Sequence, residues 1–119
     1  MATPSIAHSV AQHFDRSEPQ VRATYEQILK AARKLGPVTE EAKKTSIHLV
    51  RKTAFAGVAT RKTALILTLK SDSDLASKRI IKREQTSANR WHLEVRLESP
   101  DQVDRELSAW LAKAYELAG

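Results

Sequence analysis

The sequence predicts an α+β domain in which helices at both ends of the chain flank a run of antiparallel strands. Apolar residues recur at helical spacing before residue 36 and after residue 99, whereas between residues 38 and 98 they recur at every second position. The connections between the short apolar runs are too brief for the crossovers that parallel strands require. We therefore expect two N-terminal helices, an antiparallel sheet of five to six strands, and a C-terminal helix packed on one sheet face.

The first helix is predicted from Ser5 to about His13. Its apolar residues follow helical spacing and are Ile6, Val10 and Phe14. These side chains need an apolar partner, which either the same chain or a second copy in a swapped dimer would supply. We expect residues 1–119 to form a single domain with residues 1–15 loosely attached, either as a monomer or as a homodimer.

The second helix is predicted to begin after Ser17. Ser17 and Gln20 form a capping-box pattern, and Pro19 fits the first turn because its missing N–H would have no helical partner there. A single apolar stripe follows, made of Val21, Tyr25, Ile28, Leu29, Ala32 and Leu35. Gly36 and Pro37 then end the helix, since glycine tolerates a left-handed cap and proline cannot continue a helix.

Six strands are predicted from the period-two pattern. In chain order they are residues 38–43, 46–51, 54–59, 63–70, 79–85 and 90–98. The last strand is the clearest, because Trp91, Leu93, Val95 and Leu97 alternate with polar residues. Gly57 lies inside the third strand, where a glycine indicates a bulge or a close backbone approach. Residues 71–77 are polar and predict a loop.

The last helix is predicted to begin at Ser99-Pro100. Ser99 fits the N-cap, Pro100 the first helical position, and Gln102 completes a second capping box. The apolar stripe of this helix consists of Val103, Leu107, Trp110, Leu111, Ala114 and Leu117. Both tryptophans fall on apolar stripes, which favours core packing over a role as stacking platforms.

The sheet face opposite the helices is the first candidate site. Residues of mixed chemistry share this face, and the proposed ligand-binding residues are His48, Val50, Ile66, His92 and Glu94. We expect this face to bind a protein or a small ligand. His48, His92 and Glu94 would form a metal-ligand group only if their strands are neighbours, and the alternative is a pair of solvated histidines. No metal site and no cofactor is predicted.

The charge distribution gives an alternative function. The chain has a net charge of +6, and residues 42–83 hold eleven Lys and Arg residues against Asp72 and Asp74. Such a segment either attracts polyanions or keeps the strands soluble. The candidate nucleic-acid contacts are Lys43, Lys44, Arg51, Lys52, Arg61 and Lys62, and we expect the Arg51-Lys52 and Arg61-Lys62 pairs to converge at strand ends. Binding would show low sequence specificity.

The sequence lacks the motifs of the common enzyme classes. There is no cysteine, the three glycines form no phosphate-binding loop, and no serine lies in a G-x-S-x-G pattern. A non-catalytic accessory domain is therefore expected. No apolar run approaches the length of a membrane span, and the chain has no secretory signal, so we expect a cytoplasmic protein without membrane contact.

Three stretches carry a resemblance to known sequences. They are Leu35-Gly36-Pro37-Val38, Phe55-Ala56-Gly57-Val58, and Trp91-His92-Leu93 followed by Ser99-Pro100-Asp101 and the helix of Trp110 to Tyr115. Together they resemble a family of uncharacterised bacterial domains, a domain-of-unknown-function family, over nearly the whole chain. The C-terminal half is also distantly similar to the MmcQ/YjbR-type double-wing proteins, for which DNA binding has been suggested. Neither family supplies a catalytic motif, so the resemblance implies a fold and little about function.

Overall fold

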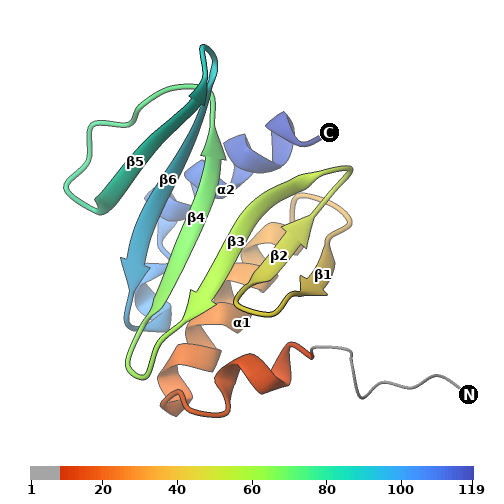
Figure 1. The fold of residues 1–119 in the computed structure, drawn as a ribbon, viewed down its shortest axis with the longest axis vertical. Coiled ribbons are helices and arrows are strands. Elements are labelled where there is room, and N and C mark those ends of the chain that lie inside the picture. Colours follow the sequence, from red (N-terminus) through yellow and green to blue (C-terminus); the bar gives the residue numbers. More distant parts are fainter. Residues whose placement is uncertain (1–8) are drawn as a thin grey trace, which may run out of the picture.

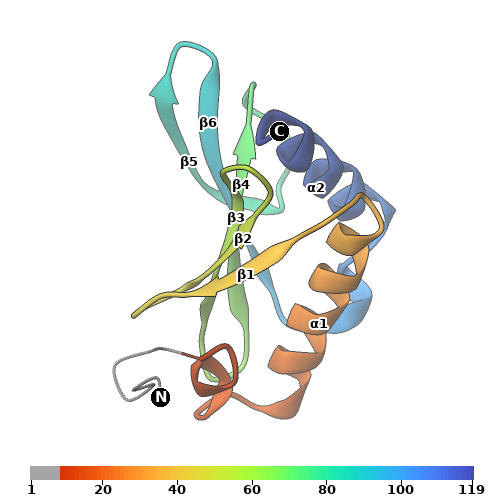
Figure 2. The same ribbon diagram turned by 90° about the vertical axis from the view of Figure 1, so that its right-hand side faces the viewer.

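The computed structural model describes residues 9–119 and contains one six-stranded antiparallel sheet with the strand order β1-β2-β3-β4-β6-β5 (Figure 1). The α+β class and the antiparallel sheet are confirmed. Both α-helices, α1 (Pro19–Arg33) and α2 (Arg105–Leu117), lie on the same side of the sheet, so no helix of residues 9–119 covers the other, open face (Figure 2). The strands are β1 (Thr39–Ala42), β2 (Ile47–Val50), β3 (Ala54–Thr60), β4 (Leu65–Ser71), β5 (Ile80–Ser87) and β6 (Arg90–Leu97).

Only one α-helix precedes the sheet in the described residues, so the prediction of two N-terminal helices is wrong. Residues 11–14 form a short 3-10 turn, η2 (Ala11–Phe14), and the residues before Ser9, including Ile6, lie outside the described part of the chain. One backbone group of η2 is bonded to a distant part of the fold. The hydroxyl of Thr60 donates to the His13 carbonyl at 2.5 Å. Phe14 is buried, with its ring centroid 5.3 Å from that of Tyr25.

The N-cap of helix α1 lies one residue later than predicted. Glu18 is the N-cap residue, while the Ser17 hydroxyl donates to the Arg61 carbonyl at 2.7 Å. Gln20 bonds the Glu18 side chain at 3.0 Å. The capping box of Ser17 and Gln20 is therefore a wrong prediction, because a partner in the β3–β4 turn competes for the serine hydroxyl.

The apolar stripe of α1 is confirmed except at its end. Val21, Tyr25, Ile28 and Ala32 are buried, whereas Leu35 lies beyond the last helical residue and is 40% exposed. The Tyr25 hydroxyl donates to Glu40 of β1 at 2.5 Å. Burial, reinforced by this hydrogen bond, raises the pKa of Tyr25 far above its usual range. The pair attaches the edge strand to the helix.

The core lies between the helices and one face of the sheet. Alternate residues of β2, β4 and β6 are buried there, as the period-two pattern predicts, and the fully buried large side chains include Ile47, Leu49, Leu65, Leu67, Leu93 and Leu97. Helix α2 contributes Leu107, Leu111, Ala114 and Tyr115. Strand β5 differs, because only Ile80 of its eight residues is buried. It forms one edge of the sheet.

Helix α2 begins later than predicted. The side chain of Gln102 accepts from the Ser99 N–H at 3.2 Å, as a capping box requires, but the turn that it caps is the 3-10 turn η3 (Pro100–Gln102). Val103 has ψ near 71°, which interrupts the helical backbone. Asp104 then caps α2 by accepting from the Leu107 N–H at 3.0 Å. No helix in residues 9–119 has the length and apolar character that crossing a membrane needs.

Candidate functional site

A hollow of about 280 Å³ lies over the middle of the open sheet face. It follows β3, with β2 on one side and β4 and β6 on the other. Residues of the open face line it, and most of them have a cross-strand partner in the register. They are Ser46, His48, Gly57, Ala59, Thr68, Lys70 and His92. We call this feature the open-face hollow.

Gly57, which has no side chain beyond its hydrogen, forms the floor of the open-face hollow. Gly57 pairs with His48 on β2 and with Thr68 on β4. A Cβ on Gly57 would lie 3.8 Å from His48 Cδ2 and 3.9 Å from Thr68 Cβ, which are ordinary contact distances. The φ angle of Gly57 is not positive, so its backbone does not require a glycine. The glycine therefore leaves space that another residue would fill.

The rim of the open-face hollow offers hydrogen-bond donors and a positive charge. Lys70 pairs across the strands with His92, and its Nζ donates to the neutral hydroxyl of Thr53 at 3.2 Å. Within residues 9–119 Lys70 forms no ion pair, so its charge is not neutralised by a carboxylate. The hydroxyl of Thr68 and the imidazoles of His48 and His92 complete the rim.

Three acids lie near the open-face hollow on the open face, and one of them, Glu84, pairs with His92 in the register. Glu94, which pairs with Thr68 in the register, lies 3.9 Å from Lys82 Nζ. Glu41, opposite His48, lies 3.4 Å from Lys43 Nζ. None of the three carboxylates lines the open-face hollow. Lys70 is therefore the one charged side chain among the described residues that line the hollow.

The structure brings together part of the predicted ligand site. His48 and His92 both line the open-face hollow, but Val50, Ile66 and Glu94 do not. The condition for a metal group fails, because β3 and β4 separate the strands of His48 and His92 by three strand spacings, about 14 Å. No cluster of three metal-binding side chains occurs in residues 9–119. The arrangement offers binding contacts around an uncharged floor.

The predicted nucleic-acid residues lie at two opposite ends of the sheet. The Lys43-Lys44 and Arg61-Lys62 pairs are in the β1–β2 and β3–β4 turns, which share one end. The Arg51-Lys52 pair is in the β2–β3 turn, at the other end of the seven-residue strand β3 and about 20 Å away. The expectation that Arg51-Lys52 and Arg61-Lys62 converge is therefore wrong. In a meander of antiparallel strands only alternate turns meet.

Arg51 also has a structural partner that accounts for its position. Its guanidinium carbon lies 4.4 Å from the centroid of the Tyr115 ring, and Nη1 donates to the Tyr115 carbonyl at 3.1 Å. These contacts satisfy a carbonyl in the last turn of α2 and place a cation at the negative end of the helix dipole. Arg51 thereby joins the β2–β3 turn to the C-terminus of α2.

Four basic residues gather at the other end of the sheet. Arg16, Lys44, Arg61 and Lys62 line an open groove of about 690 Å³ between η2 and the β1–β2 and β3–β4 turns. All four side chains are exposed, and none forms an ion pair within the described residues. We call this cluster the basic corner. Arg16 was not among the predicted contacts, because the sequence does not show that η2 returns to the β3–β4 turn.

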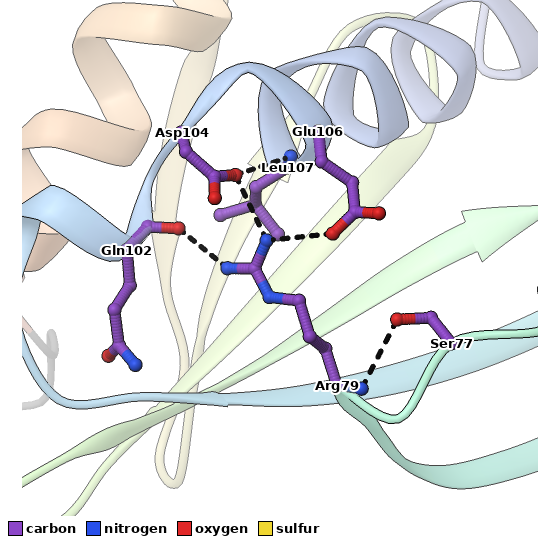
Figure 3. A network of polar contacts seen from close by, with 6 residues as sticks. All are labelled: Ser77, Arg79, Gln102, Asp104, Glu106 and Leu107. Carbon is purple, nitrogen blue, oxygen red and sulfur yellow. Dashed lines mark hydrogen bonds and ion pairs between the residues drawn. The ribbon is translucent and has the colours of Figure 1, made fainter.

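Other cations of residues 42–83 form ion pairs with carboxylates. Arg79 Nη1 donates to Asp104 at 2.9 Å and to Glu106 at 3.1 Å, and Nη2 donates to the Gln102 carbonyl at 2.6 Å (Figure 3). Partial burial acts to lower the pKa of Arg79, but its bonds to the two carboxylates outweigh this effect and raise the pKa. Arg79 therefore fastens the start of β5 to α2. Its ring contact with Trp110, at 5.7 Å, adds to this attachment.

Residues 10–118 match the family described as Domain of unknown function (DUF5655). The chain belongs to this family. No curated protein and no solved structure shows significant similarity to it. The match confirms the resemblance to a domain-of-unknown-function family that the sequence motifs indicate, and it attaches no activity to the DUF5655 domain.

The sequence of this DUF5655 domain contains a signal for two of these features, the separation of the basic pairs and the position of the hollow. Turn parity would have separated Arg51-Lys52 from the other basic pairs, because successive hairpin turns alternate between the two ends of a sheet. Gly57 is evident in the sequence as a strand glycine, but the open-face hollow also depends on Ala59, two residues along β3, and on His48 across the register. That pairing is a property of the assembled sheet.

Proposed function

We propose that the domain is a non-catalytic binding module that takes a small organic anion in the open-face hollow. The observation that carries the proposal is Gly57. A glycine inside a central strand weakens that strand by about 0.5–1 kcal/mol relative to alanine. Neither the φ angle nor the surrounding space at Gly57 requires a glycine. The weaker strand is understandable if the space above Gly57 receives a ligand.

The chemistry of the open-face hollow defines the class of ligand. Gly57 and Ala59 give an apolar floor, which favours an apolar ring or short chain. The cation of Lys70 and the donors of His48, His92 and Thr68 favour an acidic group on that ligand. A volume of about 280 Å³ suits a small molecule better than a folded partner. A carboxylate joined to an apolar body satisfies these conditions, and benzoate is the simplest probe.

The test is a titration of the domain with benzoate, followed by the backbone amide resonances in NMR spectra. Saturable shifts at Gly57, Thr68 and Lys70 are expected, with smaller shifts for the uncharged isostere benzamide because it cannot pair with Lys70. Gly57→Val should abolish the shifts by filling the hollow, and Lys70→Gln should weaken binding about tenfold or more through the loss of a charged hydrogen bond.

The matched control is Lys52→Gln, which removes the same charge at an exposed turn outside the hollow. It should bind benzoate like the unmodified domain. The proposal is contradicted if benzoate and a panel of other small carboxylates shift no open-face resonance, or if the shifts persist unchanged in Gly57→Val. A bacterial origin, a cytoplasmic location and the likeness to the double-wing proteins stay predictions, and the proposal depends on none of them.

A further inference from the structure

We infer that the basic corner is a second binding site, one that contacts the phosphate backbone of a nucleic-acid duplex. This site lies in the groove between η2 and two turns, and it shares no lining residue with the open-face hollow. Its argument is independent of the proposed function. It rests on the hydrogen bonds that fix the segments around the groove, on cations that form no ion pair in the described residues, and on a groove without apolar or aromatic lining.

The frame of the basic corner is built from hydrogen bonds between segments distant in sequence. His13 Nε2 donates to the Lys43 carbonyl at 2.8 Å, and the Ser17 hydroxyl donates to the Arg61 carbonyl at 2.7 Å. The Glu18 N–H donates to the Lys62 carbonyl at 2.8 Å. Each bond uses the main-chain carbonyl of a basic residue, and the side chains of Arg61 and Lys62 stay exposed. The backbones of Arg61 and Lys62 are therefore fixed before binding, which lowers the entropic cost of binding.

The charge of the basic corner is not neutralised by the protein. Elsewhere in the segment of residues 42–83, Lys43, Arg79, Lys82 and Arg83 form ion pairs. Arg16, Lys44, Arg61 and Lys62 form none in the described residues, and the first eight residues contain no acid that could supply one. Asp15 is the one carboxylate among the described lining residues of the groove. Four cations around one groove attract a polyanion.

A nucleic-acid backbone fits this surface better than a membrane does. An interfacial membrane site needs apolar side chains that enter the lipid. In residues 9–119 the exposed large hydrophobic residues are Leu35 and Ile81, and neither lines the groove. Phosphates spaced along a duplex can instead contact several cations at once.

The absence of exposed aromatic rings favours a duplex over a single strand. Proteins that hold single strands stack the bases on aromatic side chains. Phe14, Tyr25, Phe55 and Tyr115 are buried, both tryptophans are half-buried, and none of these six lines the groove. Contacts limited to phosphates set position without reading bases, so low sequence specificity is expected.

The test is fluorescence anisotropy of labelled DNA and RNA duplexes, of matching single strands, and of anionic vesicles, at several salt concentrations. We expect micromolar duplex binding with a log–log salt slope of about −3 to −4, as four phosphate contacts predict. Affinity should fall roughly 100-fold between about 50 and about 200 mM salt. Arg61→Gln/Lys62→Gln should reduce this fall to roughly tenfold, because two contacts are lost.

The matched control is Lys34→Gln/Lys52→Gln, which removes two exposed cations at the opposite end of the molecule. It should keep the salt slope of the unmodified domain. A second variant, Arg16→Gln/Lys44→Gln, should mimic the loss seen at Arg61 and Lys62, and thermal melts should show that all variants fold. No duplex binding at low salt, equal losses in the control, or preferential binding to vesicles or single strands would overturn the inference.

Discussion

Gly36 and Gly57 carry no side chain for opposite physical reasons. Gly36 has a φ of 151°, a backbone conformation that residues with a Cβ rarely adopt. A Cβ there would also collide with the hydroxyl of Tyr115, which donates to the Pro37 carbonyl at 3.0 Å. Gly57 has neither constraint. The first glycine serves the fold and the second leaves room on the open face.

Alanine at these two positions should therefore have opposite effects on stability. Gly36→Ala should lower the free energy of unfolding by about 1–3 kcal/mol, because strain and the collision with Tyr115 add. Gly57→Ala should leave that energy unchanged or raise it by up to about 1 kcal/mol. Urea unfolding of both variants checks the pair. Equal destabilisation by the two substitutions would contradict this account of Gly57.

Single-residue roles could be predicted from the sequence only where a local pattern decides them. The alternation of His92 and Glu94 with Leu93 placed all three on the correct sheet faces. Ser17 looks like a helix cap in isolation, yet its hydroxyl bonds the Arg61 carbonyl 44 positions away. Arg51 looks like a solvated turn residue, yet it stacks on Tyr115. These competing partners come from the assembled fold.

The N-terminus of α2 depends on one carboxylate with two partners. Asp104 accepts from the Leu107 N–H and from Arg79 Nη1. The bond from the Leu107 amide, followed by that from Arg79, lowers the pKa of Asp104 below its usual value. A lowered pKa in the folded state means that the carboxylate stabilises the fold above its unfolded pKa, and that this contribution is lost as the pH falls through the folded pKa.

Asp104→Asn should therefore cost stability at neutral pH and little in acid. The asparagine keeps the cap, so the loss is that of the charge, whereas Asp104→Ala should lose about 1 kcal/mol more through the missing cap. Urea unfolding at a series of pH values checks this. The difference between the unmodified domain and Asp104→Asn should shrink below about pH 4. A difference that stays constant with pH would show that the charge of Asp104 contributes nothing.

Element boundaries show where sequence patterns stop being sufficient. The Ser99 and Gln102 pair is a real capping box, but it closes a 3-10 turn and α2 starts only at Arg105. The sequence pattern does not show which cap starts the α-helix, because Asp104 offers a second cap two residues after Gln102. The period-two pattern predicts a strand over residues 79–85, although seven of the eight residues of β5 are exposed. Its place at the sheet edge follows from pairing with β6, which no local period encodes.

At the scale of the molecule, the loop between β4 and β5 is fastened to the edge strand β5. The chain between β4 and β5 passes β5 on the side of the sheet that the helices cover (Figures 1 and 2). Arg83 of β5 holds this loop through Asp74 at 2.7 Å and through the Leu75 and Ser77 carbonyls at 3.1 Å each. An exposed strand edge offers unpaired backbone groups to another chain. We expect the fastened loop to limit edge-to-edge association.

Releasing this loop should promote self-association. Arg83→Gln removes the ion pair with Asp74 and should cost less than about 1 kcal/mol of stability, because the contact is at the surface. Its effect should appear instead as a larger species in sedimentation velocity at high protein concentration. Lys30→Gln, an exposed helix position away from β5, is the control and should sediment like the unmodified domain. Identical sedimentation of both variants would contradict this role of the loop.

The order of the strands has a consequence for how the polypeptide holds together. Four strand pairs join neighbours in sequence, and only β4 and β6 pair across an intervening strand, through seven residue pairs from Leu65–Leu97 to Ser71–Trp91. Residues 9–71 thus form one self-paired unit and those from Ile80 onward another, and helix α2 of the second unit packs on β3 and β4 of the first. The peptide between them acts as a tether that sets an effective concentration. In this sense the domain is an intramolecular complex of two complementary halves.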